Sequence, residues 1–295
     1  MTSPTRILEA RGRNLRTARS RSSAPLEVAI AFALVSACGG SPPGPIEDAA
    51  SARDSATGAT DAGSDAFASA CAETTEVVHF DTSDGVTLEA DLRVPGVAHG
   101  PSVVLLHMIP PGNDRTNYPS VFIDALLAHG IAVLNVDRRG AGGSTGIATE
   151  AYTGPNGRLD ADAATTFLLA HACAFDRDRV ALVGASNGTT TILDYAVTAD
   201  AASVHPRALV YLTAGSYTEN QHAFVDYRAL LDAIPSLFVF ATSERAFSAA
   251  LMTGAPPAWE FEEYAPGAHG TRMFAAEPAS VGVVADFLAR VLGAP

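Results

Sequence analysis

The chain has 295 residues, is 47% hydrophobic and carries a formal net charge of −13 at pH 7. This acidic balance makes nucleic acid, or an anionic membrane surface, an unfavourable partner for the folded part of the chain. All 19 basic residues are arginine, which excludes Schiff-base and lysine-nucleophile chemistry.

The first 37 residues have the layout of an export signal. Several arginines precede a short apolar stretch at 28–35, and the small residues Ser36 and Ala37 follow it. The run VSAC, followed by two glycines, resembles the lipobox of bacterial lipoproteins, in which the cysteine, here Cys38, becomes the lipidated first residue. We therefore expect an exported protein of the bacterial cell envelope, bound to the membrane only through a lipid anchor at Cys38. A plain signal peptide and a disordered basic tail stay open as alternatives.

Residues 38–72 are rich in Gly, Ser, Ala, Pro and Asp and hold only Ile46 and Phe67 as bulky apolar side chains. Such a segment cannot bury enough surface to fold, so it is expected to be a flexible tether. The sequence thus predicts a signal peptide at 1–37, a tether at 38–72 and one folded domain at 73–295. Cys71 and Cys173 remain besides Cys38. In an exported protein they can form a disulfide, or stay as two thiols.

The folded segment alternates predicted strands and helices. Strands are expected at 76–81, 86–94, 102–107, 131–136, 180–183, 208–212, 237–241 and 259–264, and helices at 118–129, 158–172, 189–197 and 279–292. A starting hairpin followed by repeated β-α units predicts an α/β fold, with a mostly parallel sheet of about eight strands and helices on both faces. Ligands of such sheets bind at the carboxyl ends of the strands.

One serine stands at such an end. In DRVALVGASNG, at 178–188, a buried strand runs into Gly184, Ser186 and Gly188, which have the G-x-S-x-G spacing of a nucleophile on a tight strand-to-helix turn. An ordinary strand-to-helix turn is the alternative interpretation.

Four stretches make residues 73–295 resemble the α/β-hydrolase family, and among its members serine esterases and dienelactone hydrolases. They are VVLLHM at 103–108, NVDRRGAGGSTG at 135–146, LVGASNG at 182–188 and GAHG at 267–270. The resemblance implies an acyl-enzyme on Ser186 and backbone N–H groups of Met108 and Asn187 as the oxyanion hole.

A serine hydroxyl needs a base, and His269 lies in a Gly/Ala/Pro loop between the last predicted strand and the last helix, where the family also places its histidine. The family pattern after the seventh strand points to Glu244 as the acid that orients this histidine, nine residues after Pro235. Glu219 is the other candidate, and a solvated loop carboxylate is the alternative reading of Glu244.

Other motifs are given structural interpretations. His107 ends a strand and is expected to shape the oxyanion loop rather than to act as a base. The glycines of 137–146 lack the spacing of a phosphate loop, which favours a turn. No cysteine or histidine cluster has metal-ligand spacing, and no cofactor is implied. Structural or solvated roles are expected for His79, His99, His129, His171, His205 and His222.

The substrate is inferred from the short segment between Leu212 and Pro235, which leaves no room for an inserted lid domain. This favours small or externally presented acyl esters, including esters on carbohydrate. A serine peptidase, a dienelactone-type hydrolase and a non-catalytic binding protein that kept the fold stay open, and the sequence does not indicate an oligomeric state.

Overall fold

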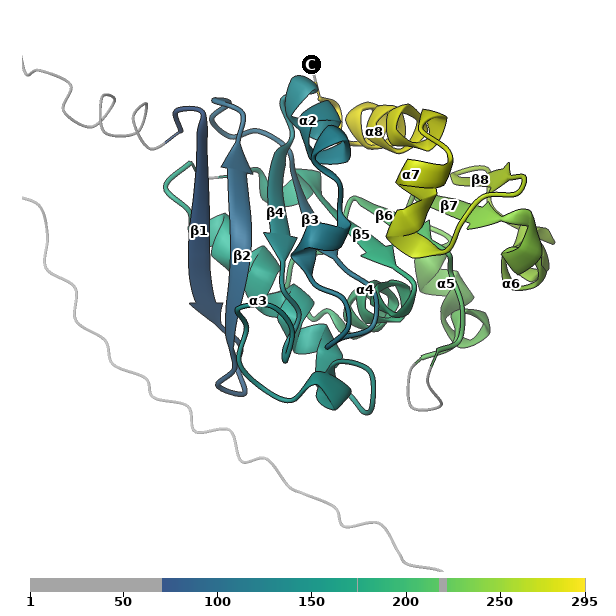
Figure 1. Ribbon diagram of the computed structural model, residues 1–295, viewed down its shortest axis with the longest axis horizontal. Helices are drawn as coiled ribbons and strands as arrows, with labels where there is room; N and C mark the ends of the chain where they lie inside the picture. Colours follow the sequence, from purple (N-terminus) through teal and green to yellow (C-terminus); the bar gives the residue numbers. More distant parts are fainter. Residues whose placement is uncertain (1–70, 174, 218–221, 295) are drawn as a thin grey trace, which may run out of the picture. The chain divides into compact units, whose positions relative to one another are not determined.

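The computed structural model describes residues 71–173, 175–217 and 222–294 (Figure 1). The predicted signal peptide, the lipidation residue Cys38 and nearly all of the predicted tether lie outside these residues, as does Glu219. Within the described residues, no helix is both long and apolar enough to cross a membrane.

Eight strands form a single mixed sheet, as the sequence predicts. The strands are β1 (Thr74–Asp81), β2 (Thr87–Val94), β3 (Ser102–Leu106), β4 (Ala132–Val136), β5 (Val180–Ala185), β6 (Ala208–Leu212), β7 (Ser236–Ala241) and β8 (Trp259–Tyr264). Their order across the sheet is β1-β2-β4-β3-β5-β6-β7-β8. The pairs β1–β2 and β2–β4 are antiparallel and all later pairs are parallel. The predicted α/β-hydrolase architecture is confirmed.

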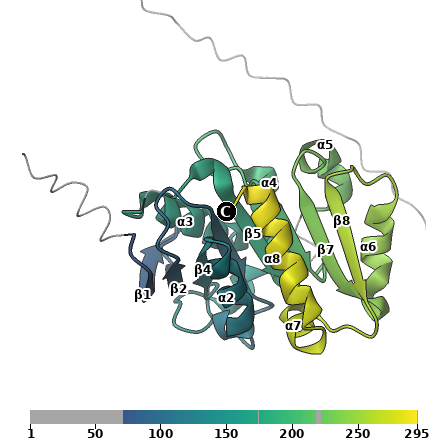
Figure 2. The ribbon, with the colours of Figure 1, turned by 90° about the horizontal axis from the view of Figure 1, so that it is seen from above.

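Helices cover both faces of the sheet (Figure 2). They are α2 (Ser120–Ala128), α3 (Gly157–Ala170), α4 (Asn187–Thr198), α5 (Arg228–Leu231), α6 (Arg245–Met252), α7 (Met273–Ala276) and α8 (Ala279–Leu292). Helices α2, α7 and α8 contribute to one apolar cluster, and α3, α4 and α6 contribute to the other.

The central strands explain why two cores form. Along β3, Val104 and Leu106 belong to the cluster with α3 and α4, whereas Val103 and Leu105 belong to the cluster with α2 and α8. All four side chains are fully buried, as expected of a strand covered on both faces. The sheet is therefore a rigid platform, and its carboxyl edge carries the loops discussed below.

The sequence did not predict three short helices. Helices α5 and α7 have four residues each, and α6 has eight and begins directly after Glu244. Segments of one or two turns carry too few apolar positions for helical periodicity to stand out. The helix that follows Glu244 has a consequence for the site, because it fixes the backbone next to that carboxylate.

Candidate active site

Ser186 occupies the predicted turn between β5 and α4. Its backbone has φ 51° and ψ −121°, a conformation that L-residues rarely adopt. The two glycines make this turn possible. A Cβ on Gly184 would lie 2.4 Å from the carbonyl oxygen of Gly188, and a Cβ on Gly188 would lie 2.4 Å from the carbonyl oxygen of Leu106. Both collisions are with backbone, so the spacing is a packing requirement of the elbow.

The structure brings Ser186, His269 and Glu244 together. The Nε2 atom of His269 lies 2.7 Å from Oγ of Ser186, and its Nδ1 atom lies 2.5 Å from Oε1 of Glu244. These residues come from three loops, after β5, after β8 and after β7. They form one continuous hydrogen-bonded chain from a hydroxyl through an imidazole to a carboxylate.

Thr213 holds this chain in place and was not singled out by the sequence. It follows β6 directly and has a positive φ of 60°. Its Oγ1 donates to Oε2 of Glu244 over 3.1 Å and accepts the N–H of Gly270 over 3.0 Å. One hydroxyl therefore connects the candidate acid to the loop that carries His269.

Tyr217 is a second residue that sequence reasoning missed. Its ring packs edge-on against His269 with 6.2 Å between centroids, and its hydroxyl donates to the carbonyl of Thr213 over 2.5 Å. Burial raises the pKa of Tyr217, and the nearby Ser186 side chain offsets part of that rise. The phenol therefore stays protonated beside the serine. No sequence motif marks it, because only the folded loop brings it there.

His107 is a buried neutral residue next to the site, as expected. Its Nδ1 lies 2.8 Å from the Met108 carbonyl and therefore carries the proton, while Nε2 accepts the backbone N–H of Arg138 over 2.9 Å. Burial and the charge of Arg138 together lower the pKa of His107 to about 3. Both ring nitrogens are occupied, so His107 orders the loop.

Met108 and Asn187, the predicted oxyanion donors, both lie close to Ser186. Met108 follows β3, and Asn187 is the first residue of α4, so its N–H has no acceptor within the helix. The Met108 side chain and Ser186 lie next to the same residue, Gly270. A Cβ added to Gly270 would be 2.7 Å from Met108 Sδ and 3.6 Å from Ser186 Cβ. That the backbone N–H groups of these two residues form the oxyanion hole stays a prediction.

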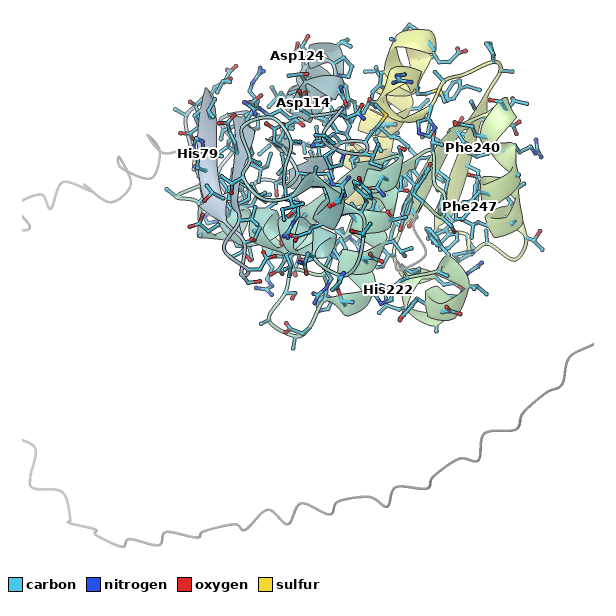
Figure 3. All side chains as sticks on the ribbon, turned by 60° about the horizontal axis from the view of Figure 1, so that its bottom comes forward. His79, Asp114, Asp124, His222, Phe240 and Phe247 are labelled. Carbon is cyan, nitrogen blue, oxygen red and sulfur yellow. The ribbon has the colours of Figure 1, made fainter. Side chains whose placement is uncertain are left out.

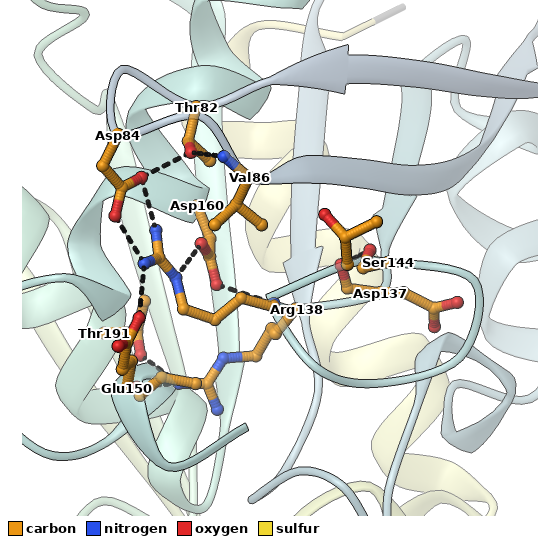
Figure 4. Close-up of polar contacts among 12 residues, drawn as sticks. Thr82, Asp84, Val86, Asp137, Arg138, Ser144, Glu150, Asp160 and Thr191 are labelled. Carbon is orange, nitrogen blue, oxygen red and sulfur yellow. Dashed lines mark hydrogen bonds and ion pairs between the residues drawn. The ribbon is translucent and has the colours of Figure 1, made fainter. Parts of the chain in front are cut away.

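The glycine-rich stretch at 137–146 is a turn after β4, as predicted, and its two arginines are fully buried. Arg139 pairs with carboxylates. It contacts Asp84 over 2.8 Å and Asp160 over 2.7 Å, and the Asp84 side chain also accepts the Thr82 hydroxyl (Figure 4). Burial alone would lower the pKa of Arg139, but these two carboxylates outweigh it and raise that pKa. No sequence motif indicates this pairing.

Two hollows flank the site. A groove of about 360 Å³ is lined by Met108, Asn113, Asn117 and Arg272, among others. An apolar cavity of about 190 Å³ lies between α4 and α6, and His222 and Phe247, both labelled in Figure 3, line it. Neither hollow has an aspartate or glutamate among its described lining residues.

The remaining site predictions have different outcomes. The described residues contain no cluster of three or more His, Cys, Asp or Glu side chains suited to a metal ion. Cys71 and Cys173 are buried thiols. Burial and the adjacent Cys71 thiol together raise the pKa of Cys173 to about 12. The two thiols are therefore neighbours, and the disulfide stays a prediction.

Residues 84–232, about half of the chain, match the family described as X-Pro dipeptidyl-peptidase (S15 family). The chain belongs to the S15 family. The match includes Ser186 and ends before Glu244 and His269, so membership in the S15 family says nothing of those two residues. No sequence among the curated proteins matches the chain.

Solved structures share the fold of this S15-family chain. An esterase from Pyrococcus furiosus superposes with a TM-score of 0.57 at 18% identity, covering 75% of this chain and 92% of that one. A thermophilic carboxylesterase cloned from a metagenomic library gives a TM-score of 0.53 at 20% identity, covering 78% and 94%. A dienelactone hydrolase from Anabaena variabilis gives 0.55 at 17% identity, covering 75% and 97%. The protein is a serine hydrolase of the α/β-hydrolase fold.

Proposed function

We propose that this protein hydrolyses carboxylic esters through an acyl-enzyme on Ser186, with His269 as the base and Glu244 as its orienting acid. One observation carries the proposal, the hydrogen-bonded chain in which His269 lies 2.7 Å from Ser186 Oγ and 2.5 Å from Glu244 Oε1. A hydroxyl, an imidazole and a carboxylate at these distances are the requirements of acyl transfer through serine.

Each group has a defined task in this reaction. His269 Nε2 takes the Ser186 proton as Oγ attacks the ester carbonyl carbon, and the C=O electrons move onto the carbonyl oxygen. The N–H groups of Met108 and Asn187 bind that oxyanion. When the tetrahedral intermediate collapses, His269 gives the proton to the departing alcohol. A water molecule then repeats the sequence on the acyl-enzyme and releases the acid. Glu244 stabilises the imidazolium throughout and is itself held by Thr213.

The surroundings of Ser186 favour small or externally presented acyl groups. The groove beside Met108 is open and small, and the segment between β6 and β7 is too short for an inserted lid domain. Esters carried on a larger molecule such as a carbohydrate fit such a site, because only the acyl group needs to enter.

Release of dipeptides from an X-Pro amino terminus is the second candidate, and the family match favours it. A protonated amino terminus needs an anionic partner. The described residues of the groove offer the cation Arg272 instead, and those of the apolar cavity offer no carboxylate. The lining of the site therefore supports the ester over the X-Pro peptide.

A direct comparison of substrates tests both candidates. Wild-type protein is expected to react with a fluorophosphonate and to hydrolyse p-nitrophenyl acetate far faster than Gly-Pro p-nitroanilide, and Ser186→Ala should abolish labelling and both turnovers. Faster cleavage of the dipeptide anilide would establish the peptidase instead. Folded wild-type protein that neither labels nor turns over would point to a binding protein.

We also propose that the protein is exported and anchored at Cys38, which lies outside the described residues. The lipobox-like run VSAC supports this. The Cys38→Ala protein should leave the membrane fraction. Unchanged partitioning would contradict the anchor.

A further inference from the structure

Arg138 is a fully buried arginine whose partners in the described part of the chain are all neutral. Its side chain donates to three backbone carbonyls, one amide oxygen and one hydroxyl. Burial, opposed in part by the charge of the more distant Asp160, lowers the pKa of Arg138 to about 10, so the guanidinium stays charged at neutral pH. A buried charge without a carboxylate is costly, and Arg138 Nε also has no partner among the described residues. Such an arrangement calls for a role other than stability.

The guanidinium contacts the peptide that supplies one oxyanion donor. Its Nη1 lies 3.3 Å from the carbonyl oxygen of His107 and 3.4 Å from that of Met108. The His107 carbonyl and the Met108 N–H belong to one planar trans peptide and point in opposite directions. A cation at the carbonyl therefore polarises the unit and strengthens the N–H as a donor on the other side. The backbone N–H of Arg138 fixes the same loop through His107 Nε2.

The same guanidinium contacts the helix that supplies the other donor. Nη1 donates to Oδ1 of Asn187 over 2.9 Å. Nη2 donates to Oγ1 of Thr191 over 2.6 Å, and both Arg138 and Thr191 are labelled in Figure 4. Asn187 and Thr191 are four residues apart and so lie on one face of α4. Nη2 also donates to the carbonyl of Ala151, which anchors the side chain from the opposite direction. One planar group thus connects the loop after β3 with the first turn of α4.

We propose that Arg138 is a positioning residue of the oxyanion hole, which sets the Met108 and Asn187 donors in register and places behind them a positive charge that touches no carboxylate among the described residues. This rests on the proposed function, because the oxyanion forms only if Ser186 attacks a carbonyl. The charge acts on the transition state more than on the bound ester, because the negative charge develops only there.

The experiment compares two variants of Arg138 with one control. Arg138→Gln removes the charge, and Arg138→Lys keeps the charge but loses the planar guanidinium with its several N–H donors. Arg139→Gln is the matched control. Arg139 is equally buried but is paired with Asp84 and Asp160. In the full-length protein, kcat and KM are measured with p-nitrophenyl acetate, together with the inhibition constant of a trifluoromethyl ketone. This ketone forms a tetrahedral oxyanion with a serine nucleophile. Unfolding midpoints show which variants are folded.

We expect Arg138→Gln to lower kcat by about 10- to 100-fold with KM nearly unchanged, and to weaken the ketone by a similar factor. Arg138→Lys should recover part of both losses. Arg139→Gln should lower the unfolding midpoint and leave kcat per folded molecule within about threefold of wild type.

Three results separate the possible failures. Wild-type kcat and ketone affinity in folded Arg138→Gln would overturn the inference while leaving the proposed function intact. If Arg138→Gln does not fold, Arg138→Lys tests the positioning role: wild-type kcat and ketone affinity in that variant would overturn this role, because the planar guanidinium would then be dispensable. A wild-type protein that neither turns over nor labels would overturn the proposed function, and this inference with it.

Discussion

Two consecutive arginines show how differently one fold can use the same buried side chain. Arg139 is surrounded by Asp84, Asp160 and, at 3.7 Å, Glu150, so its charge is neutralised where the turn after β4 meets α3. Arg138 instead contacts backbone carbonyls, an amide oxygen and a hydroxyl at the edge of the candidate oxyanion hole. The ion pairs of Arg139 hold the turn to the neighbouring elements, whereas the charge of Arg138 acts on the candidate oxyanion hole. Changes around Arg139 should therefore lower stability, and changes around Arg138 should lower activity.

The largest effect on activity is expected at Glu244, the candidate acid of the active site. Glu244→Gln should lower kcat by about 10³- to 10⁴-fold with little change in KM, because the amide no longer stabilises the His269 imidazolium. Steady-state kinetics with p-nitrophenyl acetate measures it. Glu263→Gln, which removes a carboxylate paired with Arg245 on the surface, is the control. Full activity in Glu244→Gln would remove Glu244 from the mechanism.

Asp160→Asn should give the largest loss of stability. It leaves the Arg139 guanidinium buried without its fully buried partner, and the expected fall in the free energy of unfolding is about 3–5 kcal/mol. Urea unfolding measures this. Asp84→Asn is the matched variant with a smaller effect, since the Asp84 side chain is 30% exposed. A stable Asp160→Asn protein with reduced kcat would break the division between the two arginines.

The free energy of unfolding should depend on pH through His107, which accepts the backbone N–H of Arg138. The pKa of His107 is about 3 in the folded protein, against an ordinary value of 6.5. Burial and Arg138 lower this pKa, and the Met108 carbonyl and Asp114 act in the opposite direction. The stabilising contribution of neutral His107 is therefore present above about pH 6.5 and is lost as the pH falls towards 3.

Below pH 6.5 the unfolded state binds one more proton at this residue, which costs about 1.4 kcal/mol of stability per pH unit. His107→Gln should make the acid limb of a stability profile shallower by that slope. An unchanged acid limb in His107→Gln would show that His107 is not the group responsible.

The smallest effect on activity is expected for Arg272, a solvent-exposed arginine beside the same site. Arg272 lines the groove next to Met108 and forms no ion pair among the described residues. Because solvent screens an exposed charge, Arg272→Gln should change kcat/KM for p-nitrophenyl acetate by less than about threefold. Arg207→Gln, in a hollow lined by Pro206 and Pro235, is the control with the same change of charge. A loss as large as that in Arg138→Gln would show that burial is not what distinguishes them.

The parts of this structure that sequence patterns predicted are those with a local cause. Apolar runs such as 180–183 lie in buried strands, and the glycines around Ser186 are required by contacts within the elbow itself. The closing helix was predicted to the residue, because four apolar side chains recur along it at helical spacing.

What could not be predicted depends on contacts between distant segments. Thr213 and Tyr217 follow β6 without any motif, and only the packing of three loops makes them neighbours of Glu244 and His269. The stretch at 137–146 indicates a turn equally well whichever way its two arginines point. Their partners come from α3, α4 and the loop after β1, so their different environments exist only in the folded chain.

The distribution of the site over three strands also has a consequence for biosynthesis. Ser186 follows the central strand β5, but His269 reaches it only after β8 has paired with β7 at the far edge of the sheet. Thr213 joins Glu244 to the same last loop. A growing chain therefore holds its serine without a base until its final strand is in place. Hydrolytic activity should therefore appear only after the whole sheet has assembled.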